Sequence, residues 1–204
     1  MTDTIVYRGK GNLYLNITNR CSCDCDFCFR SFTDGVFGSD LVLSQEPTAE
    51  QLTHEIELAY LDGPADEVAF VGMGEPTMRL DLVLAVAEWL TTRRLRSRLV
   101  TNGHGRLLNP DADVVGSLAR VGLGAVTVSL NAADPETYDL LCRPTFSKAF
   151  REVIHFAEAC VEAGIPTTLT AVDVPEADVA GCRAIADALG ASFRLRPYVP
   201  PPAE

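Results

Sequence analysis

Apolar residues recur along the chain in two alternating patterns, one with the two-residue period of a strand and one with the period of a helix. Short apolar runs such as 67–74 (EVAFVGMG) predict strands, and longer segments such as 48–61 (TAEQLTHEIELAYL) predict amphipathic helices. The six predicted strands lie at 12–18, 67–74, 97–103, 125–132, 167–174 and 192–199. The five predicted helices that separate them lie at 48–61, 80–94, 111–121, 147–164 and 176–190. This alternation predicts a parallel sheet with right-handed crossovers.

Two α/β arrangements fit that alternation, a doubly wound open sheet and a partial (βα)6 barrel. In the strand at 125–132, Val126 and Val128 alternate with Thr127 and Ser129. Parallel strands covered by helices on both faces are apolar almost throughout, so a polar face favours a barrel whose lumen holds a ligand and water. We therefore expect a partial (βα)6 barrel in a single domain spanning 1–204, with a short Pro-rich tail at 200–204.

The composition of the chain argues against nucleic acid and membranes as partners. The chain has 204 residues, enough for one well-buried core, and 47% of them are hydrophobic. Its net charge of −11 argues against a general nucleic-acid surface, which needs clustered Lys and Arg. The first ten residues carry no export signal and no segment is apolar enough to span a membrane. We therefore expect a cytoplasmic protein without membrane contact.

The chemically distinctive residues follow the predicted strands. A cysteine-rich segment comes after the first strand, GMGEP (72–76) after the second and TNGHG (101–105), which contains His104, after the third. Asn131 and Asp173 end the fourth and fifth strands. In parallel α/β folds the ligand binds beyond the carboxyl ends of the strands. We therefore expect a single site there.

The cysteine-rich segment is CSCDCDFC, residues 21–28. Clustered thiols in a reducing compartment favour metal chemistry over disulfides. Cys21, Cys25 and Cys28 form CxxxCxxC, and three thiolates can hold three irons of a [4Fe–4S] cluster while the fourth stays open. The alternative is a closed zinc or ferredoxin-like site that also uses Cys23, although the segment is too compact for two separated ligand pairs. If Cys23 bound the open iron it would block that position.

CxxxCxxC with an aromatic residue, Phe27, before the last cysteine resembles the radical S-adenosylmethionine (SAM) enzymes. Over roughly residues 5 to 199 the chain resembles the small radical SAM proteins linked to TatD-type hydrolases, in NLYLNITNRCSCDCDFCFR, GEPTMRLD, SLNAADPETYDLLCRP and CRAIADALGASFRLRPYV. The resemblance implies one [4Fe–4S] cluster on Cys21, Cys25 and Cys28, with SAM as second cofactor. It also implies an electron donor of flavodoxin or ferredoxin type. SAM is then cleaved to a 5′-deoxyadenosyl radical, which abstracts hydrogen from an unidentified substrate.

The same resemblance implies contacts to SAM. GMGEP resembles the GGEP element of these enzymes. The resemblance implies that Gly72, Gly74 and Glu75 bind the amino group of the methionine part of SAM. Ser129 and Asn131, on the polar face of the fourth strand, are expected to contact the ribose or the carboxylate.

Four further residues complete the candidate cofactor contacts. Asn102 follows the third strand, although Asn-Gly is also a favoured turn pair. Asp173 can accept from the ribose or serve as a loop cap. Arg196, which with Arg194 would face the lumen, needs an anionic partner such as a SAM or substrate carboxylate, or an acid of the protein. Phe27 adjoins the last ligand.

The sequence identifies no catalytic residue. Cys142 can donate a hydrogen atom if it lies at the mouth, but a buried small hydrophobe is the favoured interpretation of Cys142, Cys160 and Cys182. Three function classes remain open: a radical SAM enzyme acting on a small molecule, one modifying a protein or peptide, and a non-enzymatic four-thiolate metal-binding module. A small-molecule substrate is favoured because the chain leaves no room for a recognition domain. The segment 31–47 is either a lid or a structural wrap.

Overall fold

The computed structural model describes residues 3–201, and its centre is a seven-stranded sheet in the order β1-β2-β5-β6-β7-β8-β9. β1 (Val6–Gly9) pairs antiparallel with β2 (Asn12–Leu15), and all other neighbours are parallel. The other strands are β5 (Val68–Phe70), β6 (Ser97–Thr101), β7 (Ala125–Ser129), β8 (Thr167–Val172) and β9 (Ser192–Arg196). The parallel strands follow one another in chain order without the reversal of a doubly wound sheet. The predicted partial barrel is therefore confirmed.

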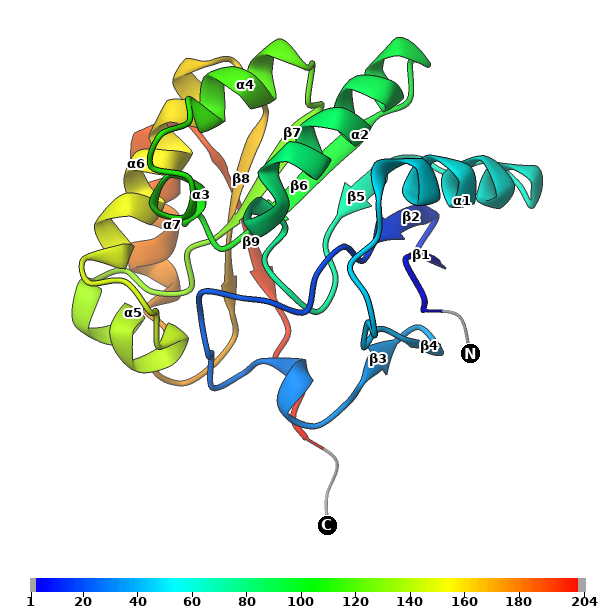
Figure 1. Ribbon diagram of the computed structural model, residues 1–204. Coiled ribbons are helices and arrows are strands. Elements are labelled where there is room, and N and C mark those ends of the chain that lie inside the picture. The colour runs from blue at the N-terminus through cyan, green and yellow to red at the C-terminus, as the bar shows by residue number, and fades with distance from the viewer. Residues whose placement is uncertain (1–2, 202–204) are drawn as a thin grey trace.

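The helices lie along the outer side of the sheet (Figure 1). Those that connect consecutive parallel strands match the five predicted segments: α1 (Ala49–Leu61), α2 (Leu80–Thr92), α4 (Val114–Arg120), α6 (Ala149–Glu162) and α7 (Val179–Leu189). The remaining ones are α3 (Gly105–Leu108), α5 (Pro135–Cys142) and the short 3-10 helices η1 (Phe29–Ser31) and η2 (Pro76–Arg79). The helix starts are encoded locally. Thr48 and Gln51 form a capping box on α1, and Asp134 caps α5 ahead of Pro135.

The two faces of the strands differ as the alternation predicted. Val126 and Val128 are fully buried in the hydrophobic core. On the opposite face Arg98 donates to Thr127 Oγ1 at 3.2 Å and forms an ion pair with Glu67 at 2.8 Å. A guanidinium and a carboxylate are tolerated inside the barrel because they satisfy each other. The lumen face is therefore polar.

The strands end earlier than predicted, because residues beyond their ends leave the sheet to build loops. β5 stops at Phe70 rather than at 74, and β9 stops at Arg196 rather than at 199. Gly72 has φ +138° and Asn131 has φ +62°, values that no strand adopts. Several short elements were not predicted: β1, α3, α5, η1, η2 and a hairpin within 31–47. The tail predicted at 200–204 lies largely outside the described residues.

The segment 31–47 is a structural wrap. It contains the hairpin of β3 (Gly35–Val36) and β4 (Ser39–Asp40). Glu46, near its end, accepts hydrogen bonds from Arg20 Nε at 2.7 Å and from Arg79 Nη1 at 3.1 Å. Leu41, within the segment, is fully buried. These contacts attach the segment to the loop that follows β2 and to the end of η2.

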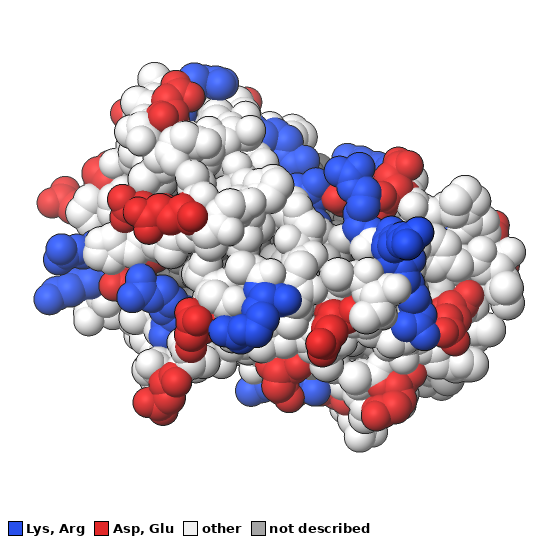
Figure 2. Space-filling view, turned by 90° about the horizontal axis from the view of Figure 1, so that it is seen from above, with Lys and Arg blue, Asp and Glu red and all other residues white. Residues whose placement is uncertain are grey.

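The surface charges of one face bear on the expectation about nucleic acid. Seen from above, Asp and Glu side chains are scattered over the face, and several Lys and Arg side chains lie close together toward the right of the view with acidic side chains beside them (Figure 2). Among residues 3–201 no helix combines the length and apolar character needed to cross a membrane.

Candidate active site

The cysteine loop, residues 16–30, runs below the strands in the view of Figure 1 and ends at η1. Its middle, 22–26, lies alongside residues 141–145, which leave the end of α5, and Cys23 forms an antiparallel bridge with Pro144. The backbone bonds between the two segments run from Asp24 N to Cys142 O (3.2 Å), from Asp26 N to Leu141 O (3.0 Å) and from Thr145 N to Ser22 O (2.9 Å). The cysteine loop is thus held as if it were an additional short strand.

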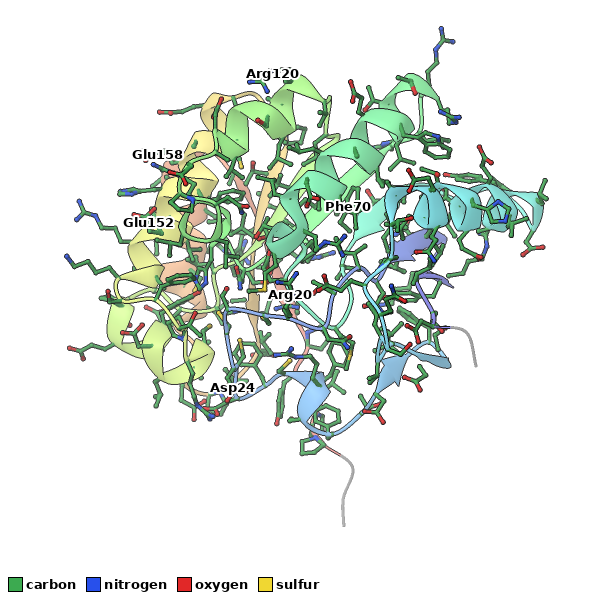
Figure 3. The ribbon with its side chains drawn as sticks, in the orientation of Figure 1. Arg20, Asp24, Phe70, Arg120, Glu152 and Glu158 are labelled. Carbon is green, nitrogen blue, oxygen red and sulfur yellow. The ribbon has the colours of Figure 1, made fainter. Side chains whose placement is uncertain are left out.

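Charged side chains reinforce this attachment. Arg143, with φ +40° at the end of α5, forms ion pairs with Asp24 at 3.6 Å and with Asp26. Asp24 lies at the outer edge of the loop, far from the helix residues Arg120 and Glu158 that are also labelled in Figure 3. The two aspartates between the cysteines therefore anchor the loop to α5.

The thiols of the cysteine loop differ in exposure. Cys21, Cys25 and Cys28 are half-buried, whereas Cys23 is only 5% exposed. The pKa of Cys25 is lowered to about 4 because the thiols of Cys142 and Cys23 hydrogen-bond to its sulfur. Burial raises the pKa of Cys21 to about 11.

No group of His, Cys, Asp or Glu among residues 3–201 surrounds one point as the ligands of a single metal ion do. That is compatible with a cluster, since each of its cysteines binds a different iron. Arg30 donates from Nε to the Cys28 sulfur at 3.3 Å, a charge-assisted contact to a predicted ligand.

A buried polar network lies behind the loop. His104 Nδ1 is 2.9 Å from Ser22 Oγ, and His104 Nε2 is 2.9 Å from Tyr138 Oη. Asn102 Nδ2 donates to the same serine at 2.9 Å. His104 is fully buried rather than exposed at the mouth, and burial lowers its pKa to about 4, so the ring is neutral.

Glu75 does not face the open site. Its carboxylate is 3% exposed, and burial raises its pKa. It accepts from Thr101 Oγ1 at 2.7 Å and from Asn102 N at 2.7 Å, and it caps η2 through Thr77 N at 2.9 Å. In this conformation the carboxylate joins the loop after β5 to the loop after β6, and its predicted contact with SAM stays a prediction. Asn102 likewise directs its side chain to the cysteine loop, and its predicted SAM contact stays a prediction.

Close packing explains why both positions of GMGEP are glycine. A Cβ on Gly72 would meet the side chain of Asn16, and a Cβ on Gly74 would meet the backbone carbonyls of Arg20 and Thr18. The glycines thus let the second loop approach the first. Within residues 3–201, no donor reaches the carbonyl oxygens of residues 72–74. These oxygens are free to accept from a ligand ammonium group.

Two buried polar atoms lack a partner at the carboxyl ends of the strands. Asn131 is 3% exposed, and its Oδ1 has no hydrogen bond among the described residues, while its Nδ2 reaches the Cys142 sulfur at 3.5 Å. Arg196 Nε is also buried without a partner there, and burial lowers the pKa of this guanidinium. Buried polar groups of this kind are normally satisfied, so this pair points to an absent ligand. Ser129 ends β7 half-buried on the same side, whereas Asp173 is exposed after β8.

Residues 15–187 match the family described as the Radical SAM superfamily, which is most of the chain. The chain belongs to the radical SAM superfamily. Curated relatives include the GTP 3',8-cyclases of Nostoc punctiforme (28% identical over 80% of this chain and 48% of that protein) and of Rhodococcus opacus (31%, 81% and 44%). The chain thus spans about half the length of the curated relatives it matches. The proposed resemblance to TatD-linked proteins is a finer statement than these matches support.

Solved radical SAM structures share the fold. Streptococcus suis SuiB bound to its precursor peptide SuiA superposes with a TM-score of 0.73 at 17% identity, covering 91% of this chain and 39% of SuiB. The [FeFe]-hydrogenase maturase HydG gives 0.66 at 16% identity, covering 92% of this chain and 42% of HydG. Radical SAM proteins are enzymes that use a [4Fe–4S] cluster and SAM, and these are the cofactors of this chain. Membership of this superfamily argues against the third function class, a non-enzymatic metal-binding module.

The described residues fit these cofactors. Three half-buried thiols lie on one loop, and the unpaired Asn131 Oδ1 and Arg196 Nε offer an acceptor and a donor beside it. Phe27 borders a cavity of about 360 Å³, a size typical of small-molecule sites. The other residues that line it are Asp26, Leu140, Leu141, Val174, Pro175, Glu176 and Tyr198.

Several contributors were missed from the sequence. The supporting roles of Ser22, Tyr138 and residues 141–145 were not predicted, although most of these residues lie in segments that carried the family resemblance. Arg30 has one signal, its position two residues after the last cysteine of the motif. Cys142 is buried in the hydrophobic core as expected, and it also contacts Asn131 and Cys25.

Proposed function

We propose that Cys21, Cys25 and Cys28 hold the [4Fe–4S] cluster and that SAM binds at its open iron, in the space between the cysteine loop and the ends of β7 and β9. When bound, the cluster supplies the electron that cleaves SAM to methionine and a 5′-deoxyadenosyl radical, which abstracts hydrogen from the substrate. The protein holds the cysteine loop against residues 141–145 and shields the site from water.

The observation that carries this proposal is the pair of unpartnered atoms, Asn131 Oδ1 and Arg196 Nε. An acceptor and a cationic donor, both buried, match the hydroxyl and carboxylate groups that SAM presents. The free carbonyl oxygens of residues 72–74 suit its ammonium group. Phe27 and the adjacent cavity suit an apolar or aromatic portion of a ligand. Ser129 and Asp173 remain predicted contacts.

We further propose a small molecule as substrate. The support is the cavity of about 360 Å³ beside Phe27 and the names of the curated relatives, which are enzymes that act on GTP. A protein or peptide substrate is the second candidate. A flavodoxin or ferredoxin as electron donor, a functional link to a TatD-type hydrolase and a cytoplasmic location also remain predictions.

Anaerobic reconstitution with iron and sulfide tests the proposal. After reduction with dithionite in the presence of SAM, 5′-deoxyadenosine is measured by mass spectrometry for wild type, Cys28→Ala and Cys160→Ala. We expect product from wild type and from Cys160→Ala, whose thiol is buried on α6, and none from Cys28→Ala. Product from Cys28→Ala at the wild-type rate would remove Cys28 from the ligand set.

A further inference from the structure

Cys23 lies among the three proposed ligands, yet its thiol is turned into the protein. Its side chain is 5% exposed. The sulfur is 3.6 Å from Asn102 Nδ2 and 3.8 Å from His104 Nδ1. Its backbone is fixed as well, since it forms the bridge with Pro144 and accepts from Arg30 Nη2 at 3.3 Å.

The polar groups around this thiol are satisfied in one consistent pattern. Asn102 Nδ2 donates to Ser22 Oγ, which leaves the serine proton for the unprotonated His104 Nδ1, and the Cys23 thiol shares the same acceptor nitrogen at 3.8 Å. His104 then carries its proton on Nε2 and donates it to Tyr138 Oη at 2.9 Å. Ser22, His104 and Tyr138 are at most 1% exposed, so the network cannot exchange these bonds for water.

A restraint on this thiol is needed because the thiol lies close to the ligands. The thiols of Cys23 and Cys25 are in contact, so a modest loop movement would bring Cys23 to an iron. A fourth thiolate closes an iron–sulfur cluster, as in four-cysteine ferredoxin sites. A closed cluster has no iron left for SAM.

We propose that His104, anchored by Ser22 and Tyr138, is a positioning residue that holds Cys23 away from the cluster and so keeps one iron open for SAM. The inference rests on the proposed function, since it takes Cys21, Cys25 and Cys28 as the ligands. In this account Cys23 is a potential competitor of SAM for the open iron, and His104 prevents that competition.

The test compares SAM binding by the reconstituted, reduced cluster, followed as the change that SAM causes in its electron paramagnetic resonance spectrum. The variants are Cys23→Ala, Cys25→Ala, His104→Leu, His104→Asn and the double variant His104→Leu/Cys23→Ala. Leu fills the space of the ring without a polar atom, whereas Asn keeps a polar atom near the Nδ1 position. Thermal unfolding and iron content are recorded for each variant.

We expect Cys23→Ala and His104→Asn to bind SAM like wild type. If Cys23 occupies the open iron in nine-tenths of the His104→Leu molecules, the apparent Kd for SAM rises about tenfold. The double variant should return to the wild-type Kd, because the competing thiol is gone. Restoration by a second substitution distinguishes competition from general damage.

Other outcomes overturn the inference. Unchanged SAM binding in a folded His104→Leu variant would show that Cys23 needs no restraint. A loss that the double variant does not restore would make His104 merely structural, and so would loss of folding in both. If instead wild type shows no spectral response to SAM and Cys25→Ala retains its iron, the proposed ligand set itself falls.

Discussion

Gly72 offers the sharpest test of how the second loop is packed against the first. It has φ +138°, and a Cβ there would meet the Asn16 side-chain oxygen and, at 3.0 Å, the Asn16 Cα. Asn16 is fully buried, so it has no room to move aside. Its amide donates to Leu41 O (2.7 Å) and Thr4 O (3.1 Å) and accepts from Met73 N (3.2 Å).

Gly72→Ala therefore has two separable effects. The backbone conformation alone costs about 1 to 3 kcal/mol for a residue with a Cβ. Displacing Asn16 disturbs its hydrogen bonds with Leu41, Thr4 and Met73, each worth about 0.5 to 1.5 kcal/mol net, so a further loss of about 2 to 4 kcal/mol is expected. The sum is a large share of the stability of a domain of this size.

Gly63 provides a matched control, with φ +139° and no atom within 4 Å of a built Cβ. Urea unfolding of the cluster-free protein would give the unfolding free energies of wild type, Gly63→Ala and Gly72→Ala. Gly63→Ala should show only the backbone effect, and Gly72→Ala should be less stable than Gly63→Ala by about 2 to 4 kcal/mol. Equal losses in the two variants would refute the reasoning that Asn16 fixes the approach of the loops.

Two further predictions concern the attachments of the site. Glu46→Gln should lower the unfolding free energy by about 1 kcal/mol at pH 7. The value is small because solvent screens the partly exposed ion pairs of Glu46. The hydrogen bond from Arg20 lowers the pKa of Glu46, so its stabilisation is present above the pKa of the unfolded residue and is lost as the pH falls through the lower folded pKa. The gap between wild type and Glu46→Gln should therefore narrow in urea unfolding as the pH is lowered below the pKa of the unfolded residue, and a gap that stays constant down to the lowest pH at which the protein folds would contradict an ionic clamp. Tyr138→Phe should cost about 1 to 3 kcal/mol because it leaves buried His104 Nε2 without a partner; urea unfolding beside half-buried Tyr14→Phe checks this, and equal effects would contradict it.

The fold was predictable because the spacing of the apolar residues identifies the strands, the helices and their alternation along the chain. In the strand at 125–132 the alternation of Val126 and Thr127 identified both the core face and the lumen face. β1 and α5 were missed for physical reasons. β1 is a short edge strand of four residues, and α5 is a short helix inside what reads as a loop, announced only by its Asp134-Pro135 start.

The candidate site was predictable where one motif contains all its parts. The spacing of Cys21, Cys25 and Cys28 is local in sequence, so a single pass along the chain finds it. The supports are not local: Ser22 and His104 are separated by 82 residues, and Glu75 is turned inward by donors from Thr101 and Asn102. Contacts of that range depend on how the loops pack, which no spacing rule encodes.

The central claim is that three of the four clustered thiols hold the cluster and leave one iron for SAM. The most direct measurement is 5′-deoxyadenosine formed from SAM by the reconstituted, reduced protein, comparing Cys23→Ala with Cys25→Ala, two variants of the same loop. The account predicts product from Cys23→Ala and none from Cys25→Ala. Product from neither, with iron binding that requires Cys23, would mean a closed four-thiolate site and would contradict the account.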